Sequence, residues 1–421
     1  MSITRPKGTN DFLPIDTAKW QYIEKILRET AAAYGYEELR TPIFEATDLF
    51  LRGVGETTDI VNKEMYTFED KGGRSITLRP EGTASTARAY IEHKLHAQPQ
   101  PVKLWYIGPM FRYERPQKGR FRQFHQFGLE AFGSQDPALD SEVIAFALTF
   151  YNKLGLQGLS VRLNSVGCPH CRQEHKKALQ EFLRPALDEL CADCRGRFEK
   201  NPLRIFDCKN EKCQALIVNA PTILDCLCTE CEEHFAKVKG YLSAAEIPYH
   251  VDARLVRGLD YYTKTAFEIL LEDIGAQSAI CGGGRYDGLI KEIGGPETCG
   301  VGFALGMERV FSAMEAQGLS FPENDQCDVF LASMGDEAKA TLFNIAVALR
   351  AQGIRVEMDY GSKSLKAQLK AAGRLKVKYA VILGEDELAQ DAAILRDMTD
   401  ATQTTVKIAA ITEEVIRRMK Q

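Results

Sequence analysis

The sequence lacks the features that mark membrane and secreted proteins. It has no stretch of the roughly 20 apolar residues that a membrane-spanning helix needs. Its longest apolar run, VIAFALTF at 143–150, fits a buried helix instead. The first residues, MSITRPKGTNDFLP, contain no apolar core of the kind found in a secretory signal. These absences predict a cytoplasmic protein that does not bind or span a membrane.

The common glycine-rich nucleotide motifs are also missing. No GK[ST] follows a glycine-rich loop, and GVGFALG at 300–306 has the wrong spacing for a dinucleotide fingerprint. An excess of positive charge is lacking too, because the net charge is −5. That charge excludes binding of nucleic acid through bulk charge but permits local basic patches.

Length and strand pattern predict the domain organisation. A chain of 421 residues is longer than a domain with one hydrophobic core usually is, so two or three domains are expected. Through residue 325 the expected strands, among them ELRTPIF at 38–44 and YHVDARLVRG at 249–258, are mainly hairpin-connected, which predicts an α+β fold with an antiparallel sheet. Later strands alternate with helices, as in a small parallel α/β domain. We therefore predict domains at 1–325 and 326–421, with a helical, cysteine-rich insertion at 167–235.

A basic segment, FRYERPQKGRFRQFHQF at 111–127, is the first candidate for chemistry. It carries five basic residues against one acid, with aromatic residues interleaved. Guanidinium groups bind phosphate bidentately and aromatic rings stack on bases, so the segment favours a nucleotide or phosphate site. The alternative is a solvated basic hairpin. Arg309, just past the glycines of 300–306, could supply another cation for a phosphate.

Three shorter segments each permit two interpretations. LVRGLDYY at 255–262 is a turn, or a pocket that needs a fixed cation and phenolic hydroxyls. In TLRPEGT at 77–83, Glu81 either favours the dipole of a helix start or pairs with a ligand ammonium. The glycines of AICGGGRYDG at 279–288 mark a bulge or the close approach of a ligand.

Taken together and in this order, five segments resemble the bacterial form of histidyl-tRNA synthetase, a class II aminoacyl-tRNA synthetase. They are TLRPEGT, YIGPMFRYERPQKGRFRQFHQFGLE, LVRGLDYY, AICGGGRYDGL and GVGFALGMERV. The resemblance covers nearly the whole chain, beginning with RPKGTNDFLP and with YGYEELRTPIFE as class II motif 1. The arginine-bearing motifs 2 and 3 are shared across the class, whereas RGLDYY and CGGGRYDG look particular to the histidine enzyme.

The resemblance implies a class II antiparallel catalytic sheet, a C-terminal anticodon-binding domain and a two-step reaction. The carboxylate of L-histidine attacks the α-phosphate of ATP, which is bound with Mg²⁺, to give histidyl-adenylate and diphosphate. The 3′ end of tRNA(His) then takes the histidyl group. Motif 1 implies a homodimer. Two alternatives are the non-catalytic paralogue that serves as regulatory subunit of ATP phosphoribosyltransferase, and a generic ATP- or RNA-binding module.

The resemblance also assigns residues by position. Arg112 and Arg257 are the catalytic cations, with Arg257 lying between the histidine carboxylate and the α-phosphate. Glu81, Thr83 and Gln126 would receive the α-amino group, and Glu130 with the two tyrosines would hold the imidazole. The ATP-binding set, in which Phe124 stacks on adenine, is Arg112, Arg120, Phe124 and Arg309. The histidine-binding set is Glu81, Gly82, Thr83, Arg112, Gln126, Glu130, Arg257, Tyr261 and Tyr262.

Cysteine is concentrated in the predicted insertion, where nine of the twelve lie between Cys168 and Cys231. Such clustering favours metal ligation or reduced thiols over disulfides in a cytosolic chain. One zinc site could use the first two pairs in sequence order and a second the last two, although the pairing cannot be read from the sequence. His170, His175 and His234 could substitute as ligands. The candidate ligands of a structural Zn²⁺ are Cys168, Cys171, Cys191, Cys194, Cys208, Cys213, Cys228 and Cys231.

One basic segment remains in the C-terminal domain. SKSLKAQLKAAGRLKVK at 362–378 carries six basic residues and no acid. It could lie along the anticodon stem of the tRNA or be a plain solvated helix.

Overall fold

The computed structural model describes residues 2–55, 58, 60–117, 119–271, 279–322, 327–361 and 363–420. The chain divides into two units, Met1–Phe321 and Pro322–Gln421. The boundary predicted at 325 and 326 falls outside the described residues.

An eight-stranded sheet forms the centre of the first unit, in the order β1-β5-β6-β11-β10-β9-β7-β8. Only the outer pairs, β1 with β5 and β7 with β8, are parallel. The other neighbours are antiparallel, so the predicted fold class is confirmed. The strands are β1 Glu37–Glu38, β5 Val102–Phe111, β6 Gln123–Phe132, β7 Leu159–Ser165, β8 Tyr249–Val251, β9 Thr263–Leu271, β10 Ala279–Arg285 and β11 Gly300–Gly306.

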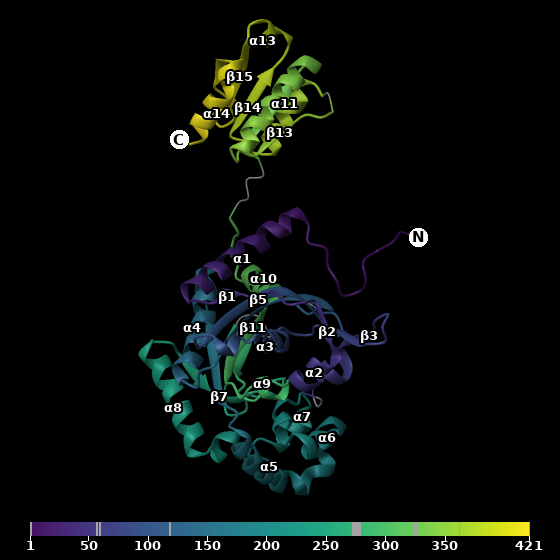
Figure 1. The fold of residues 1–421 in the computed structure, drawn as a ribbon, viewed down its shortest axis with the longest axis vertical. Coiled ribbons are helices and arrows are strands. Elements are labelled where there is room, and N and C mark those ends of the chain that lie inside the picture. Colours follow the sequence, from purple (N-terminus) through teal and green to yellow (C-terminus); the bar gives the residue numbers. More distant parts are fainter. Residues whose placement is uncertain are drawn as a thin grey trace. The chain divides into compact units, whose positions relative to one another are not determined.

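Four helices share the main hydrophobic core with this sheet, and all four are labelled in Figure 1. They are α1 Pro14–Ala33, α4 Pro137–Lys153, α8 Thr229–Ala244 and α10 Met307–Ala316. Both α1 and α4 begin at a proline, whose fixed φ suits the first helical position. Asp136 also caps α4, since its Oδ1 accepts from the Ala138 N–H at 2.9 Å.

Alternation along β6 separates this core from the opposite face of the sheet. Phe127, Leu129 and Ala131 belong to the main core. Because successive side chains point to opposite faces, the alternate residues of β6, Gln126 and Glu130 among them, point the other way. Three further helices, α2 Thr47–Val54, α3 Thr83–Glu92 and α9 Leu289–Glu292, contribute to separate clusters on that side.

Two of the strands expected from the sequence are shorter than predicted. The segment at 38–44 is broken around Pro42 into two strands. The first is β1 of the large sheet, and the second, β2 Phe44–Ala46, belongs to a small sheet with β3 Tyr66–Glu69 and β4 Ser75–Leu78. The segment at 249–258 is strand only through Val251, in β8. Arg257 therefore lies in an irregular loop rather than in a sheet.

The cysteine-rich insertion is helical, as expected. It contains α5 Pro169–Leu183, α6 Ala192–Lys200 and α7 Glu211–Leu216, with 3-10 turns at Arg184–Glu189, Pro202–Asp207 and Ile223–Cys226. In Figure 1 these helices gather at the end of the first unit away from α1. Val256, from the LVRGLDYY loop, packs in the core of the insertion.

The second unit is built on a five-stranded sheet in the order β13-β12-β14-β15-β16. The predicted parallel pattern is confirmed for β13, β12 and β14, and the sheet also contains an antiparallel hairpin, β15 and β16, that the sequence did not predict. No helix within the described ranges combines the length and apolarity needed to cross a membrane. The elements are β12 Val329–Ser333, α11 Asp336–Ala351, β13 Val356–Met358, α12 Leu365–Arg374, β14 Tyr379–Leu383, α13 Glu385–Ala389, β15 Ala392–Asp397, β16 Gln403–Lys407 and α14 Ile411–Met419.

Candidate active site

A cavity of about 360 Å³ lies on the face of the large sheet opposite the main core. Its size suits a small-molecule site. Of the predicted ATP- and histidine-binding residues, all but one line it; Gly82 instead precedes α3 as its N-cap. The predicted residues in the lining are Glu81, Thr83, Arg112, Arg120, Phe124, Gln126, Glu130, Arg257, Tyr261, Tyr262 and Arg309.

Glu130 is a fully buried carboxylate surrounded by hydroxyl groups. Its Oε1 accepts from Thr83 Oγ1 at 2.8 Å and from Tyr106 OH at 3.3 Å, and its Oε2 accepts from Tyr286 OH. Burial raises the pKa of Glu130 to about 8, although the hydrogen bonds from Tyr286 and Thr83 oppose that rise. Only glycine fits opposite on β11, since a Cβ at Gly302 would lie 2.0 Å from Glu130 Oε2.

Glu81 and Gln126 offer oxygen acceptors in the same cavity. Glu81 accepts from the backbone N–H groups of Thr83 and Ala84 at 2.7 and 2.8 Å, so it closes the first turn of α3. Burial raises the pKa of the Glu81 carboxyl, against those backbone hydrogen bonds. The Oε1 atom of Gln126 is buried and has no hydrogen-bond partner in the described part of the chain. A ligand ammonium would satisfy that oxygen.

Three arginines bring positive charge to the cavity, each with part of its guanidinium engaged. Arg112 Nε donates to Pro80 O at 2.8 Å, and the guanidinium carbon of Arg112 lies 5.3 Å from the centroid of the Phe124 ring. Arg120 Nη1 pairs with Glu114 Oε2 at 3.3 Å. Arg309 Nη1 donates to Ala279 O at 2.6 Å. Burial, and then the positive charge of Arg120, lower the pKa of Arg309. Such mutual repulsion indicates a site prepared for an anion. Lys118, from the same basic segment, lies outside the described residues.

Arg257 reaches the cavity from the LVRGLDYY loop. Its Nη1 forms an ion pair with Glu268 Oε1 on β9, and its guanidinium carbon lies 5.9 Å from the Tyr262 ring. Arg257 Nε is buried without a partner among the described residues. Gly282 provides the space for this side chain, because a Cβ there would lie 2.3 Å from Arg257 Nη2.

The sequence interpretation missed three residues that bond predicted site residues, of which Tyr286 and Glu268 line the cavity and Tyr106 does not. Tyr286 and Tyr106 bond Glu130, and Glu268 pairs with Arg257. Tyr286 could have been identified from the sequence, because it lies in the segment AICGGGRYDG, which already stood out. In the structure its ring centroid is 5.5 Å from that of Tyr261. Nothing local marks Tyr106 or Glu268, because Tyr106 meets Glu130 on a neighbouring strand and Glu268 meets Arg257 from the LVRGLDYY loop.

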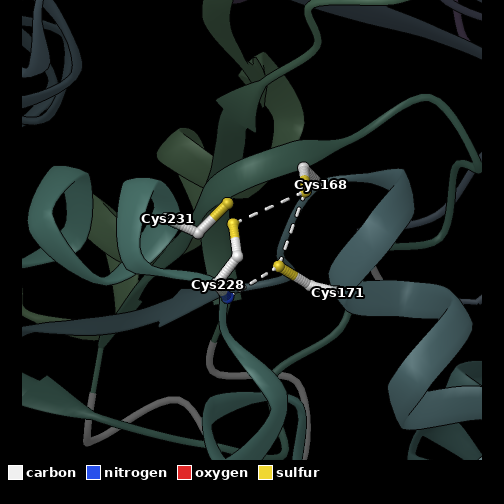
Figure 2. A group of neighbouring side chains, drawn as sticks. All are labelled: Cys168, Cys171, Cys228 and Cys231. Atoms are coloured by element: carbon white, nitrogen blue, oxygen red, sulfur yellow. Dashed lines mark hydrogen bonds between the residues drawn. The ribbon is translucent and has the colours of Figure 1, made fainter.

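The cysteines converge in a different grouping from sequence order. Cluster A is Cys168, Cys171, Cys228 and Cys231, and cluster B is Cys191, Cys194, Cys208 and Cys213. Joining the first two pairs to each other is therefore wrong, since the starts of α5 and α8 lie together (Figure 2). The three histidines belong to neither cluster; His175 Nε2, for example, lies 3.0 Å from Pro221 O.

Comparison with known proteins gives consistent matches along the whole chain. A family model described as histidyl-tRNA synthetase matches residues 8–310, and one described as anticodon binding domain matches residues 326–418. A histidine–tRNA ligase of Desulfitobacterium hafniense is 60% identical, with 100% of this chain and 99% of the relative covered. One of Desulforamulus reducens is 59% identical, with 97% of each covered. The structure of apo S. aureus histidyl-tRNA synthetase matches with a TM-score of 0.85 and 42% identity, covering 98% of this chain and 100% of that one.

Proposed function

The chain belongs to the histidyl-tRNA synthetase family, and from this premise we propose that it activates L-histidine with ATP and transfers the histidyl group to the 3′ end of tRNA(His). The observation that carries the proposal is a single cavity that joins a hydroxyl-caged carboxylate, Glu130, to a set of arginines. Imidazole offers both a donor and an acceptor nitrogen, which a carboxylate and phenols can distinguish from an apolar isostere. The arginines suit the phosphates of ATP.

In the first step, the side chains of the cavity position two reactants and stabilise charge. The α-ammonium of histidine binds Glu81, Thr83 and Gln126, and its ring lies between Glu130 and the tyrosines of the loop. Arg112 and Arg257 then stabilise the negative charge that develops on the α-phosphoryl oxygens as the histidine carboxylate attacks. Diphosphate leaves, and histidyl-adenylate remains for the tRNA.

Adenine stacks on Phe124 in this proposal, and Arg120 and Arg309 hold the β- and γ-phosphates. Mg²⁺ enters with ATP as their counter-ion, which agrees with its preference for phosphates and one or two carboxylates. Three carboxylates of the lining are already engaged, Glu114 with Arg120, Glu268 with Arg257 and Glu308 with His125. We assign no protein ligand to the metal for that reason.

Histidine-dependent exchange of diphosphate into ATP tests the activity, followed by charging of tRNA(His). We expect exchange with histidine and none with the other amino acids. The regulatory-subunit alternative predicts no exchange, but it has less support, because the chain keeps the arginines of the cavity and matches histidine–tRNA ligases over its full length. Exchange with a different amino acid would contradict the proposed specificity.

Tyr262→Phe should weaken histidine binding while leaving the chemical step nearly intact. Tyr262 lies in the cavity with its ring centroid 4.7 Å from that of Tyr261, and the substitution removes only a hydroxyl group. A neutral hydrogen bond contributes about 0.5–1.5 kcal/mol, so we expect KM for histidine to rise roughly three- to tenfold. Steady-state exchange kinetics would check this, and a fall in kcat with an unchanged KM would contradict it.

Residues 326–421 are proposed to bind the anticodon region, in keeping with the matching family model. Helix α12 presents exposed lysines, Lys366 and Lys370, to solvent. Replacing both by glutamate should weaken tRNA affinity and lower its dependence on salt concentration, since each phosphate contact releases about one counter-ion. Filter binding across a salt series checks this. Equal affinity at every salt concentration would leave α12 a plain solvated helix.

We also propose a homodimer that works in the cytoplasm, where translation occurs. In the single chain, Ile43 and Phe44 of the motif 1 segment are 44% and 54% exposed, which is large for apolar side chains and would be reduced in an interface. Light scattering of the purified protein should give twice the mass of the chain; a monomer at micromolar concentration would contradict this.

A further inference from the structure

The two cysteine clusters have the geometry of metal sites rather than of disulfides or packed thiols. In cluster A the Sγ atom of Cys168 lies 3.5 Å from that of Cys171 and 3.9 Å from that of Cys228. In cluster B the Sγ atoms of Cys191 and Cys208 are 3.8 Å apart. The sulfur atoms of a disulfide are about 2.05 Å apart. A zinc ion bound to four thiolates at about 2.3 Å requires sulfur atoms about 3.8 Å apart.

Helix starts place the thiols so that a metal can bind several at once. Cys168, Cys191 and Cys228 are the N-cap residues of α5, α6 and α8, and each is followed three residues later by a second ligand in the first turn. Figure 2 shows the two pairs of cluster A. This C-x-x-C spacing brings both sulfur atoms of a pair to the same point. Backbone N–H groups at a helix start also favour the thiolate form that zinc needs.

Backbone N–H groups orient the sulfur atoms, as the surroundings of a metal site normally do. The Cys228 N–H donates to Cys171 Sγ at 3.1 Å, and in cluster B the Cys191 N–H donates to Cys213 Sγ at 3.3 Å. The Asn210 N–H donates to Cys208 Sγ at 3.4 Å. Each of these N–H groups would stabilise the thiolate form that a metal requires.

Thiol packing alone does not account for these clusters. Cys168, Cys191 and Cys228 are only partly buried, whereas thiols that serve as small apolar side chains are usually fully buried. The ninth cysteine of the insertion, Cys226, belongs to neither cluster. Eight of nine thiols therefore converge in two sets of four.

The clusters are also placed to hold the loop that supplies Arg257. Arg172, next to Cys171, donates from Nη1 to Asp260 O at 3.4 Å. Between the two halves of cluster B, Asn201 donates to Asp260 Oδ1 at 3.1 Å and Arg204 donates to Gly258 O at 2.9 Å.

We propose that the insertion binds two structural zinc ions, one in cluster A and one in cluster B, and that the two ions hold the insertion against the LVRGLDYY loop. Each site takes up Zn²⁺ as its four thiols release their protons to solvent. Cluster A joins the two ends of the insertion, at the starts of α5 and α8. Cluster B joins α6 to α7 and fixes the turn that carries Asn201 and Arg204. The metals take no part in the reaction, since no cysteine of either cluster lines the cavity.

Metal analysis of the full chain, purified without added zinc or chelator, tests the stoichiometry. We expect two zinc ions per chain, and one in either Cys231→Ser (cluster A) or Cys213→Ser (cluster B). Cys226→Ser is the matched control and should keep two. A wild-type content of none or one, iron in place of zinc, or a loss in the Cys226 variant equal to that in the others would each overturn the proposal.

Two measurements keep the test independent of how well the variants fold. On wild-type protein, a mercurial thiol reagent should release two equivalents of zinc to a colorimetric indicator. Growth in cobalt should give the visible absorption of tetrahedral Co²⁺–thiolate sites. Release of no zinc, or protein without that absorption, would overturn the metal assignment. Neither measurement reads aminoacylation, so failure of this proposal and failure of the proposed function are distinguishable.

Amide hydrogen exchange tests the link to the loop. In Cys213→Ser, peptides covering 255–262 should exchange faster than in wild type, while peptides of β6 and of the second unit stay unchanged. Cys226→Ser should match wild type throughout. Unchanged exchange over 255–262 in a variant that has lost one zinc would overturn the positioning role.

Discussion

Replacement of Arg257 by alanine is expected to slow histidyl-adenylate formation by about 10²–10³-fold, the loss typical when a fixed charge stabiliser is removed from a reaction centre. Arg257 lines the cavity, its Nη1 pairs with Glu268, and its Nε has no partner in the described part of the chain. A guanidinium cannot lose its proton in a protein, so its contribution is electrostatic rather than that of a base. Single-turnover formation of the adenylate is the measurement.

The distribution of the effect between kinetic constants is part of this prediction. Negative charge on the α-phosphoryl oxygens is larger in the transition state than in the bound reactants, so kcat should fall more than KM for histidine rises. Tyr262→Phe should show the opposite pattern. The two variants together separate a residue that serves the chemical step from one that serves recognition of the ring.

Two control variants distinguish loss of the Arg257 charge from damage to the loop. Arg254→Ala removes an exposed arginine from the same loop, outside the cavity lining, and should change the rate by less than about twofold. Arg257→Lys keeps the charge but not the planar guanidinium, and its rate of adenylate formation should lie between the rates of Arg254→Ala and Arg257→Ala. Equal losses in the Arg254 and Arg257 variants would indicate damage to the loop, and a rate within threefold of wild type in Arg257→Ala would remove its catalytic role.

The sequence could predict those parts of the site that depend on local order. The strand and helix that carry Arg309 are continuous in the chain, so glycines followed by an arginine predicted a cation at a helix start, and α10 begins at Met307. The basic hairpin likewise brings Arg112 and Phe124 together, because β5 and β6 are consecutive antiparallel strands in which Met110 pairs with Phe124.

Contacts between distant strands could not be predicted in the same way. Glu130 on β6 meets Tyr286, which follows β10, across the intervening strand β11, and that order depends on pairings of segments far apart in the sequence. Cluster A joins two pairs of thiols that are about 57–63 positions apart in the sequence. Cysteine spacing identified the pairs but contained nothing on which pair faces which.

The loop that carries Arg257 shows why local pattern alone predicted the wrong structure there. Residues 249–258 alternate apolar and polar side chains in part, which favours a strand, yet the strand ends at Val251. Val256 packs into the insertion core instead, and Arg204 binds the carbonyl of Gly258. Tertiary contacts with the insertion override the local preference, as is common for short strands.

Glu130→Gln is expected to weaken histidine binding by roughly 10- to 100-fold, since a hydrogen bond to a charged group contributes about 1.5–3 kcal/mol. The substitution keeps the size of the side chain but removes the carboxylate that forms when histidine binds within the cage of three hydroxyl groups. Titration calorimetry with histidine measures the loss. Thr83→Ser, which keeps its hydroxyl donor, is the matched control and should bind histidine within about threefold of wild type.

The pH dependence of the same binding gives a sharper test. Burial raises the pKa of Glu130 to about 8, so at pH 7 most of the unliganded protein carries a protonated carboxyl. A ring N–H that donates to this group favours its ionised form, and binding therefore releases a proton. Histidine affinity should rise with pH between about 7 and 8.5 more steeply in wild type than in Glu130→Gln. The imidazole and the α-ammonium of histidine titrate equally with both proteins, so the difference in slope is the contribution of Glu130.

The free energy of unfolding of the unliganded protein should change with pH in the opposite direction to the histidine affinity. The native state binds more protons than the unfolded chain between the ordinary pKa of Glu130, 4.5, and its raised value of about 8, so the free energy of unfolding contributed by this group falls as pH rises through that window. Glu130→Gln has no proton to lose and should remove that part of the decline. A wild-type affinity that is flat from pH 7 to 8.5, with the same unfolding profile in both proteins, would contradict a protonated Glu130 and leave the hydroxyl cage as a purely neutral hydrogen-bond network.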